Sequence, residues 1–342
     1  MNDSDFGVFV STIENIKPHE NADKLEIATI KGWQVVVPIG AYKAGDHVLY
    51  VPIDAVVPLE ISDKWGVTQY LHRQKVRAAR LRGEMSFGFI APIEEINGSI
   101  PEINTDVSEF YGIIKYVPQD LNVRLSQGEA EKQNPKFFKY TKIYNYRNFP
   151  DIFIDGESVV ATEKLHGTST RGGIVSGEET EKYCVGSHNV QKRIGSDSLY
   201  EMTLSAPGVE ACLNGLHEKT GGDVIIYGEI FGYKIQDLQY DLKTVEVMFF
   251  DISINGEYMD YGEFLYECAK YGIKHVPLIY SGPFNEEKLW GMAAGKSTIA
   301  NHIKEGIVIK PGHERTDPSC GRVILKMISN EYLLRKNGTE YN

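Results

Sequence analysis

Short apolar runs separated by turn residues are the main pattern in the first third of the chain. Gly, Asp and Pro lie between these runs, as at Gly45-Asp46. Short strands at close spacing with turn chemistry between them are typical of a small barrel or sandwich rather than of βαβ units. We therefore predict a β-rich domain over residues 1–115. Its expected strands cover residues 6–10, 25–30, 33–38 and 47–51.

A polar stretch follows, and the pattern beyond it is mixed. Residues 117–150 are rich in Gln, Asn and Pro, which indicates a linker over 116–140 and a second domain over 141–342. Two segments of this domain have helical character, 263–271 with Gly272 as its C-cap, and 286–293. Its apolar runs of strand length are residues 159–162, 224–227, 245–252 and 307–309.

Composition excludes several classes of protein. The 342 residues are 42% hydrophobic and 24% charged, which is ordinary for a globular chain. No apolar run approaches the roughly 20 residues of a membrane helix. The N-terminus has no basic segment before an apolar core, so no secretory signal is visible. The four cysteines have no C-x-x-C spacing, which argues against a zinc site and a disulfide framework. This cysteine usage indicates a reducing, cytoplasmic location. We expect no membrane partner.

The charge balance restricts the way in which the chain could hold a nucleic acid. With 36 basic and 47 acidic residues the formal net charge is −11, and this field repels a polyanion. A local basic patch is therefore required. Residues 73–82 contain five basic residues and no acidic one, and alternation predicts Arg73, Lys75 and Arg77 on one strand face. This segment is a candidate RNA-binding face, the alternative being an ordinary solvated strand.

Candidate chemistry in the second domain lies where apolar runs end. Lys164 follows such a run in Thr162-Glu163-Lys164-Leu165-His166-Gly167, although by itself it could be a surface lysine on a turn. Four later segments also carry polar or aromatic residues at strand ends, where side chains can converge on one cleft. These residues are Glu229, Phe250, the pair Glu305 and Lys310, and Lys326. There is no G-x-G-x-x-G, and Gly295-Lys296-Ser297 lacks the first glycine of a P-loop.

The five segments, in this order, resemble the covalent nucleotidyltransferase superfamily of DNA ligases, RNA ligases and capping enzymes. The Lys164-Leu165-His166-Gly167 turn followed by residues 228–232 and 233–238 is most similar to ATP-dependent RNA ligases, over roughly residues 140–335. Residues 16–26 resemble tRNA-binding OB domains. Residues 32–37 and 43–46 resemble the OB module that precedes the catalytic domain in one RNA ligase branch.

The resemblance implies an α+β chain with an N-terminal OB-type β-barrel. A nucleotidyltransferase domain of antiparallel sheets flanked by helices would follow. Only seven residues follow Arg335, so we expect no C-terminal OB domain, which argues against DNA ligases and capping enzymes.

The resemblance also implies a role for each site residue. Lys164 would attack the α-phosphate of ATP and form lysyl-AMP, with Lys310 and Lys326 as cationic neighbours that stabilise phosphate charge. Glu305 would hold Mg²⁺ (or Mn²⁺) through water. The expected nucleotide-binding set is Glu163 at the adenine amine, Gly167 in the turn, Glu229 at the ribose, Phe250 stacked on adenine and Arg147 at a phosphate.

Two histidines are harder to assign. His166 lies two residues after Lys164, and a hydrogen bond that stabilises the turn is a simpler role for it than general acid catalysis. His188 stands between Ser187 and Asn189, where the family more often has a basic residue, and this departure leaves its role open.

The predicted function is therefore that of an ATP-dependent RNA ligase. We expect a monomer that seals RNA with 5′-phosphate and 3′-hydroxyl ends, in RNA repair. One alternative is a non-catalytic RNA-binding protein with an OB module and a degenerate nucleotide pocket. The other alternative is a capping-type guanylyltransferase.

Overall fold

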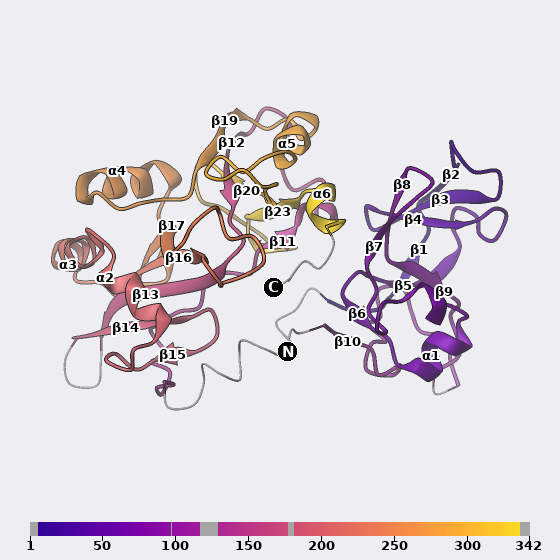
Figure 1. Ribbon diagram of the computed structural model, residues 1–342, viewed down its shortest axis with the longest axis horizontal. Helices are drawn as coiled ribbons and strands as arrows, with labels where there is room; N and C mark the ends of the chain where they lie inside the picture. Colours follow the sequence, from indigo (N-terminus) through magenta and orange to yellow (C-terminus); the bar gives the residue numbers. More distant parts are fainter. Residues whose placement is uncertain (1–5, 97, 117–128, 177–180, 336–342) are drawn as a thin grey trace. The chain divides into compact units, whose positions relative to one another are not determined.

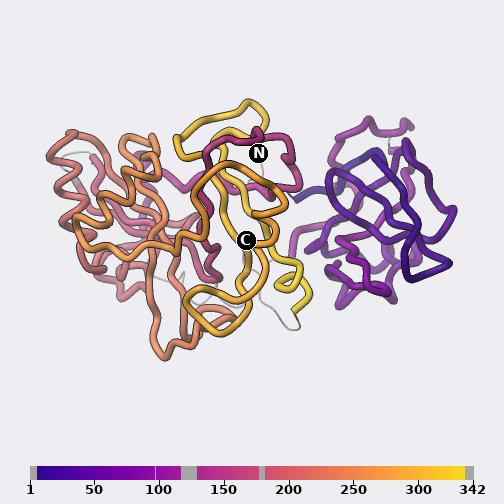
Figure 2. The backbone as a smooth tube through the Cα atoms, turned by 90° about the horizontal axis from the view of Figure 1, so that it is seen from above, coloured from indigo at the N-terminus to yellow at the C-terminus, as the bar shows by residue number. Residues whose placement is uncertain are grey.

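A computed structural model describes residues 6–96, 98–116, 129–176 and 181–335 of the chain. The chain divides into two compact units, Met1–Val117 and Pro118–Asn342. In Figures 1 and 2 the indigo-to-purple part is the first unit and the magenta-to-yellow part is the second. Within the described ranges, no helix is long and apolar enough to cross a membrane.

The first unit consists mainly of short antiparallel strands. Its sheets have the orders β1-β5-β9, β2-β3-β4, β7-β8 and β6-β10. The side-chain amide of Gln34 donates to the carbonyl of Met85 and joins β4 to β8. Its elements are β1 (Phe9–Thr12), β2 (Asn15–Pro18), β3 (Leu25–Ile30), β4 (Trp33–Pro38), β5 (His47–Val51), β6 (Ala55–Val56), α1 (Leu59–Lys64), η1 (Thr68–Tyr70), β7 (Ala78–Leu81), β8 (Glu84–Phe87), β9 (Phe89–Ala91) and β10 (Ile114–Lys115).

Three of the four strands predicted in the first unit are confirmed with their expected bounds, namely β3, β4 and β5. The fourth lies later than expected, because β1 begins at Phe9 rather than at residue 6. The backbone amide of Val8 donates to the side chains of Asp106 and Ser108 instead of to a strand. A loop more than 90 residues away therefore decides where this strand starts.

The second unit contains two sheets. One has the order β11-β23-β20-β12-β19 and the other β15-β14-β13-β16-β17-β18. The strands are β11 (Tyr144–Asn145), β12 (Ser158–Lys164), β13 (Thr168–Ser176), β14 (Glu181–Ser187), β15 (Gln191–Lys192), β16 (Val224–Gly232), β17 (Val245–Ile254), β18 (Glu257–Tyr258), β19 (Leu278–Pro283), β20 (Gly306–Pro311), β21 (Thr316–Asp317), β22 (Gly321–Arg322) and β23 (Leu325–Ile328). Parallel pairing of β11 with β23 places the first and the last of these strands side by side (Figure 1).

Helices cover the outer faces of the two sheets. Apolar residues of α3 and α4 pack on the six-stranded sheet against Val224, Ile226 and Ile252. Leu289 and Ala293 of α5 pack on the other sheet. The helical segments are η2 (Tyr146–Asn148), η3 (Leu199–Glu201), α2 (Met202–Ser205), α3 (Val209–Thr220), α4 (Tyr261–Tyr271), α5 (Glu286–Ala293) and α6 (Asn330–Leu333).

Both predicted helices are confirmed, and Gly272 ends α4 in the left-handed conformation at φ 70°. The helix α3 and the hairpin β13-β14 were not predicted. Tyr227 and Ile225 project from the opposite face of the six-stranded sheet and pack with Ile324 of the segment that enters β23. The inner faces of the two sheets therefore meet at this cluster.

The structure of the predicted linker, residues 116–140, differs from expectation. Residues 117–128 lie outside the described residues. In the remainder, Phe137 and Tyr140 are buried in the core of the second unit. The guanidinium of the buried Arg171 donates to the carbonyl of Phe137 and lies over its ring. Residues 129–140 are therefore part of the second unit.

Candidate active site

The turn that carries Lys164 connects the two sheets of the second unit. Strand β12 ends at Lys164 in the five-stranded sheet, and β13 begins at Thr168 in the six-stranded sheet. A Cβ on Gly167 would lie 2.2 Å from the carbonyl oxygen of Ile230. Glycine is therefore required where the turn crosses β16, and this close approach sets the position of the preceding lysine.

Lys164 forms an ion pair with Glu305. Its Nζ lies 2.6 Å from Oε1 of Glu305, and the two side chains are 18% and 4% exposed. Backbone pairing of Lys164 with Gly306 brings the two residues together across β12 and β20. Burial by itself would raise the pKa of Glu305, but the charges of Lys164 and His166 lower it to about 2. Glu305 is therefore an ionised carboxylate at neutral pH.

His166 is buried and held from several sides. Its Nε2 contacts Oδ1 of Asp237 at 2.7 Å, and its Nδ1 contacts the hydroxyl of Tyr332 at 2.9 Å. The same Nδ1 lies 3.4 Å from Oε2 of Glu305, and the backbone amide donates to the hydroxyl of Tyr240. Burial lowers the pKa of His166, but the two carboxylates outweigh it and raise the pKa overall. The expected hydrogen bonding is present, with partners far from the turn.

Glu229 lies in β16 opposite Ser169 of β13, beside the turn. Its pKa is raised to about 7, mainly by burial and also by the charge of Glu305. Lys164 and the backbone amide of Gly167 lower the pKa only in part. A carboxyl group with this pKa can exchange a proton at neutral pH and can accept hydrogen bonds from a ligand.

Phe250 stands at a β-bulge. Tyr227 pairs with Asp251 and Gly228 pairs with Phe249, so Phe250 is the extra residue on β17. Bulges re-aim side chains near active sites. Phe249 is 1% exposed, as predicted for the core residue of this pair. Phe250 is partly buried and meets the ring of Tyr140 edge-on at 4.9 Å.

Glu163 is buried and has one oxygen without a hydrogen-bond partner. Its Oε2 accepts from the backbone amide and the hydroxyl of Thr298, at 2.8 and 2.6 Å. Its Oε1 is buried and makes no hydrogen bond in the part of the chain that the structure describes. Leaving a buried carboxylate oxygen unpaired is costly, so this atom is suited to a donor brought by a ligand or by water.

Lys326 lies on the same sheet face as Lys164. It pairs with Val308 in β20, and Val308 pairs with Thr162 in β12. Because side chains alternate along a strand, Thr162 and Lys164 project from one face, and Lys326 projects from that face too. The structure thus brings Lys326 to the side of the sheet that carries Lys164.

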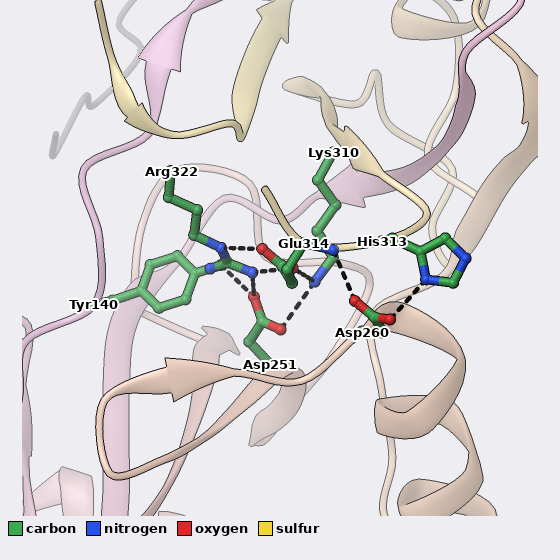
Figure 3. Close-up of polar contacts among 7 residues, drawn as sticks. All are labelled: Tyr140, Asp251, Asp260, Lys310, His313, Glu314 and Arg322. Carbon is green, nitrogen blue, oxygen red and sulfur yellow. Dashed lines mark hydrogen bonds and ion pairs between the residues drawn. The ribbon is translucent and has the colours of Figure 1, made fainter. Parts of the chain in front are cut away.

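Lys310 projects from the same face but lies farther along it from Lys164. It pairs with Val160, four residues before Lys164, which places it roughly 13 Å along the strand from the pairing position of Lys164. Its Nζ lies 2.9 Å from Asp251 and 2.9 Å from Glu314, in a buried cluster with Arg322 (Figure 3). Burial would raise the pKa of Asp251, but the two cations lower it. These carboxylates hold Lys310 toward the other end of the strand, away from Lys164, and its role at a phosphate stays a prediction.

Two further predicted residues lie at the edge of the second unit. The Arg147 guanidinium stacks 4.3 Å from the ring of Trp290 and contacts Asn330 at 3.3 Å. His188 lies in the turn between β14 and β15, where the Ser187 hydroxyl accepts from the amide of Val190. Their roles toward a nucleotide stay predictions.

The basic segment of the first unit differs from its predicted shape. Arg73 and Gln74 have φ of 52° and 64°, and His72 and Lys75 exchange backbone hydrogen bonds, so this is a hairpin turn. Lys75 forms an ion pair with Asp54 at 2.7 Å, and β7 begins only at Ala78. The prediction that Arg73, Lys75 and Arg77 lie on one strand face is therefore wrong. The exposed arginines of the segment are Arg73, Arg77, Arg80 and Arg82.

Sequence reasoning missed the residues that support the site. Asp237 lies within the segment 233–238 that carried part of the family resemblance, but its chemistry was not interpreted. Tyr332 reaches His166 from 166 positions away, and nothing in the local pattern around it indicates this contact. Within the described ranges, no group of three or more His, Cys, Asp or Glu side chains could hold a metal ion by itself.

Comparison with known proteins identifies the family. An RNA ligase family model matches residues 157–328, half of the chain, and an OB-fold domain model matches residues 8–93. No match was found among curated protein sequences.

Solved structures of a Naegleria gruberi RNA ligase are similar along almost the whole chain. A variant with ATP and Mn has 26% identity and a TM-score of 0.80, covering 95% of this chain and 97% of that chain. The same ligase with PPi has 26% identity and a TM-score of 0.79, with the same coverage. The predicted α+β fold class, with an OB fold before a sheet-rich nucleotidyltransferase domain, is confirmed. Neither alternative function is favoured, and this chain belongs to the RNA ligase family.

Proposed function

We propose that this RNA ligase carries AMP on Lys164 and uses it to join a 5′-phosphate end of RNA to a 3′-hydroxyl end. The observation that supports this proposal best is the ion pair between Lys164 and the ionised Glu305, at the end of β12 and near Glu229. A similar ligase has been solved with ATP and Mn, which supports ATP as the source of AMP.

The described residues fit an adenine nucleotide. The unpaired Oε1 of Glu163 offers an acceptor to the exocyclic amine of adenine, which guanine lacks at that position. Phe250, displaced by its bulge, offers a flat π-face at little entropic cost. Glu229 offers an acceptor for a ribose hydroxyl. We assign these three residues and Gly167 to ATP binding.

The carboxylates also fit a hydrated divalent cation. Mg²⁺ is usually held by one or two carboxylates together with water and substrate phosphates, so a three-residue protein cage is not required. Glu305, whose pKa is about 2, is the residue that we assign to this ion. The cation supplies neutralisation of phosphate charge during group transfer.

Sealing then takes three steps, in which AMP passes to Lys164, AMP passes to the RNA, and the two RNA ends are joined. The ammonium of Lys164 first loses a proton to solvent. The neutral amine then attacks the α-phosphorus of ATP, the bond to pyrophosphate breaks, and the nitrogen gives a second proton to solvent. The 5′-phosphate of RNA next takes AMP from Lys164, which regains a proton. The 3′-hydroxyl attacks the activated 5′-phosphorus and releases AMP. Lys326, on the same sheet face, is assigned to stabilise the phosphate charge in these steps.

We assign RNA binding in part to the first unit, proposed as an OB domain over residues 1–115. The whole chain carries −11, so local basic groups must hold the RNA backbone. Exposed Arg73 and Arg77, with Arg80 and Arg82 of the same segment, are better suited to this than Lys75, which is paired with Asp54. A monomeric state, a cytoplasmic location and a role in RNA repair are part of the same proposal.

A sealing assay tests the proposed function. The protein is incubated with Mg²⁺, ATP and two RNA strands that present a 5′-phosphate and a 3′-hydroxyl, and joined strands are resolved by denaturing electrophoresis. We expect joining that requires the 5′-phosphate and is much slower with GTP. Joining that proceeds equally with a 5′-hydroxyl strand, or equally with GTP, would contradict the proposal.

A further inference from the structure

The short helix α6 and the residues that flank it contact the groups that surround Lys164. The amide of Ser329, the N-cap of α6, donates to the carbonyl oxygen of Glu305 at 2.8 Å. The hydroxyl of Tyr332 contacts Nδ1 of His166 at 2.9 Å. One short segment thus contacts both the backbone of Glu305 and the imidazole beside its carboxylate.

Arg335 adds a second connection to the same imidazole. Its Nε donates to Oδ2 of Asp237 at 2.9 Å, and the other oxygen of Asp237 contacts Nε2 of His166 at 2.7 Å. The Arg335 guanidinium also lies 3.5 Å from the centroid of the Tyr332 ring and donates to the Tyr332 carbonyl. Tyr332 and Arg335 therefore support each other. Tyr332 contacts Nδ1 of His166 directly, and Arg335 acts on Nε2 through Asp237.

The contacts continue from His166 to the ion pair between Glu305 and Lys164. His166 is 2% exposed, and its Nδ1 lies between the Tyr332 hydroxyl and Oε2 of Glu305. The other oxygen of Glu305 lies 2.6 Å from Nζ of Lys164. A carboxylate that contacts a restrained ring at one oxygen has less freedom to rotate at the other. The rotation of the Glu305 carboxylate, and with it the position of the lysine amine, is thus restrained from α6.

We propose that Tyr332 and Arg335 are positioning residues for the adenylylation of Lys164, acting through His166 and Asp237 on the carboxylate of Glu305. This inference rests on the proposed function, because it takes Lys164 as the nucleophile. Catalytic groups must be held close to their productive geometry, and a small misplacement costs rate rather than substrate affinity. The predicted signature is therefore a slower chemical step with unchanged ATP binding.

The substitution Tyr332→Phe tests this with little disturbance of the fold. It keeps the buried ring and its stacking with Arg335, and it removes one oxygen atom. We expect the rate of Lys164 adenylylation at saturating ATP to fall about tenfold, the equivalent of one charge-assisted hydrogen bond, while KM for ATP stays within about twofold. Arg335→Gln removes the ion pair with Asp237 and is expected to lower the same rate by a similar factor.

A matched control separates positioning from stability. Tyr183→Phe also removes a tyrosine hydroxyl, one that donates to Asn214 at 2.6 Å in a different part of the unit. It should leave the adenylylation rate unchanged. Thermal unfolding of all variants is followed in parallel, with Tm shifts of no more than a few degrees expected from one lost hydrogen bond.

The outcomes distinguish this inference from the proposed function. If the unaltered protein forms no AMP adduct on Lys164, the proposed function fails. If it does and Tyr332→Phe reacts at the same rate, only the positioning role is overturned. A rate loss that is matched by Tyr183→Phe, or that disappears on cooling well below a lowered Tm, would show a purely structural role and overturn it as well.

Discussion

Two lysines on the same pair of strands have different surroundings. Lys164, at the end of β12, is 18% exposed and pairs with Glu305. Lys310, in β20, is 6% exposed and pairs with both Asp251 and Glu314, beside Arg322. An ammonium held by a buried and a partly buried carboxylate has a structural role, because freeing it would leave those charges unpaired. The comparison indicates that surroundings, rather than position in a motif, decide which lysine can act as a nucleophile.

The largest expected effect is that of Lys164→Ala. Without the attacking amine, formation of the AMP adduct should fall by more than about a thousandfold. Sealing of RNA that already carries a 5′-adenylate should continue, because that step does not use the amine as a nucleophile. The two activities are measured with labelled ATP and with pre-adenylated RNA. A variant that still labels at the original rate would show that another residue carries AMP.

The next effect is that of Glu305→Gln, which keeps the shape of the side chain and removes its charge. We expect adenylylation and the sealing of pre-adenylated RNA both to fall by about a hundredfold or more, since the cation that neutralises transition-state charge would lose its charged ligand. Glu287→Gln, an exposed change in α5, is the matched control. If Glu305→Gln seals pre-adenylated RNA at the original rate, the assignment of the metal ion to Glu305 is wrong for that step.

The substitution Lys310→Met tests the other lysine. Removing one partner of a buried ion pair costs about 3–5 kcal/mol, so the free energy of unfolding should fall by this amount in chemical denaturation. The adduct should still form on Lys164 at temperatures where the variant is folded. Lys219→Met, at an exposed position in α3, should change neither property. Unchanged stability together with lost adenylylation would instead support the predicted role of Lys310 in stabilising phosphate charge.

The sequence was sufficient for the strands β3 to β5, the helices α4 and α5, and Lys164 at the end of β12, because periodicity and turn residues are local signals. Glu229 and Phe250 lie inside β16 and β17 rather than at the strand ends where they were expected. The sequence was not sufficient for Lys310, because its buried partner Asp251 lies 59 positions away in the chain. The bulge at Phe250 and the turn at Arg73 also lacked a local signal, since neither contains the glycine or asparagine that usually marks such backbone. Long-range contacts and backbone irregularities are therefore what the pattern could not supply.

The smallest expected effect concerns pH and Glu229. Its pKa in the folded protein is about 7, above the value of an exposed glutamate, so the folded state binds the proton more tightly. The stability contributed by this proton is fully present at low pH and is lost as pH rises through 7. Glu229→Gln should therefore gain stability relative to the unaltered protein between about pH 4.5 and 7, with a constant difference above about pH 8. A difference that does not change over that interval would contradict the raised pKa.

Mapping of the AMP adduct tests the central claim most directly. The unaltered protein is incubated with ATP and Mg²⁺, digested without acid to preserve the P–N bond, and its peptides are analysed by mass spectrometry. The account predicts one modified residue, Lys164, and an unmodified Lys310. AMP on Lys310 or on any other residue, or a protein that turns over ATP and joins RNA without forming an adduct, would contradict it.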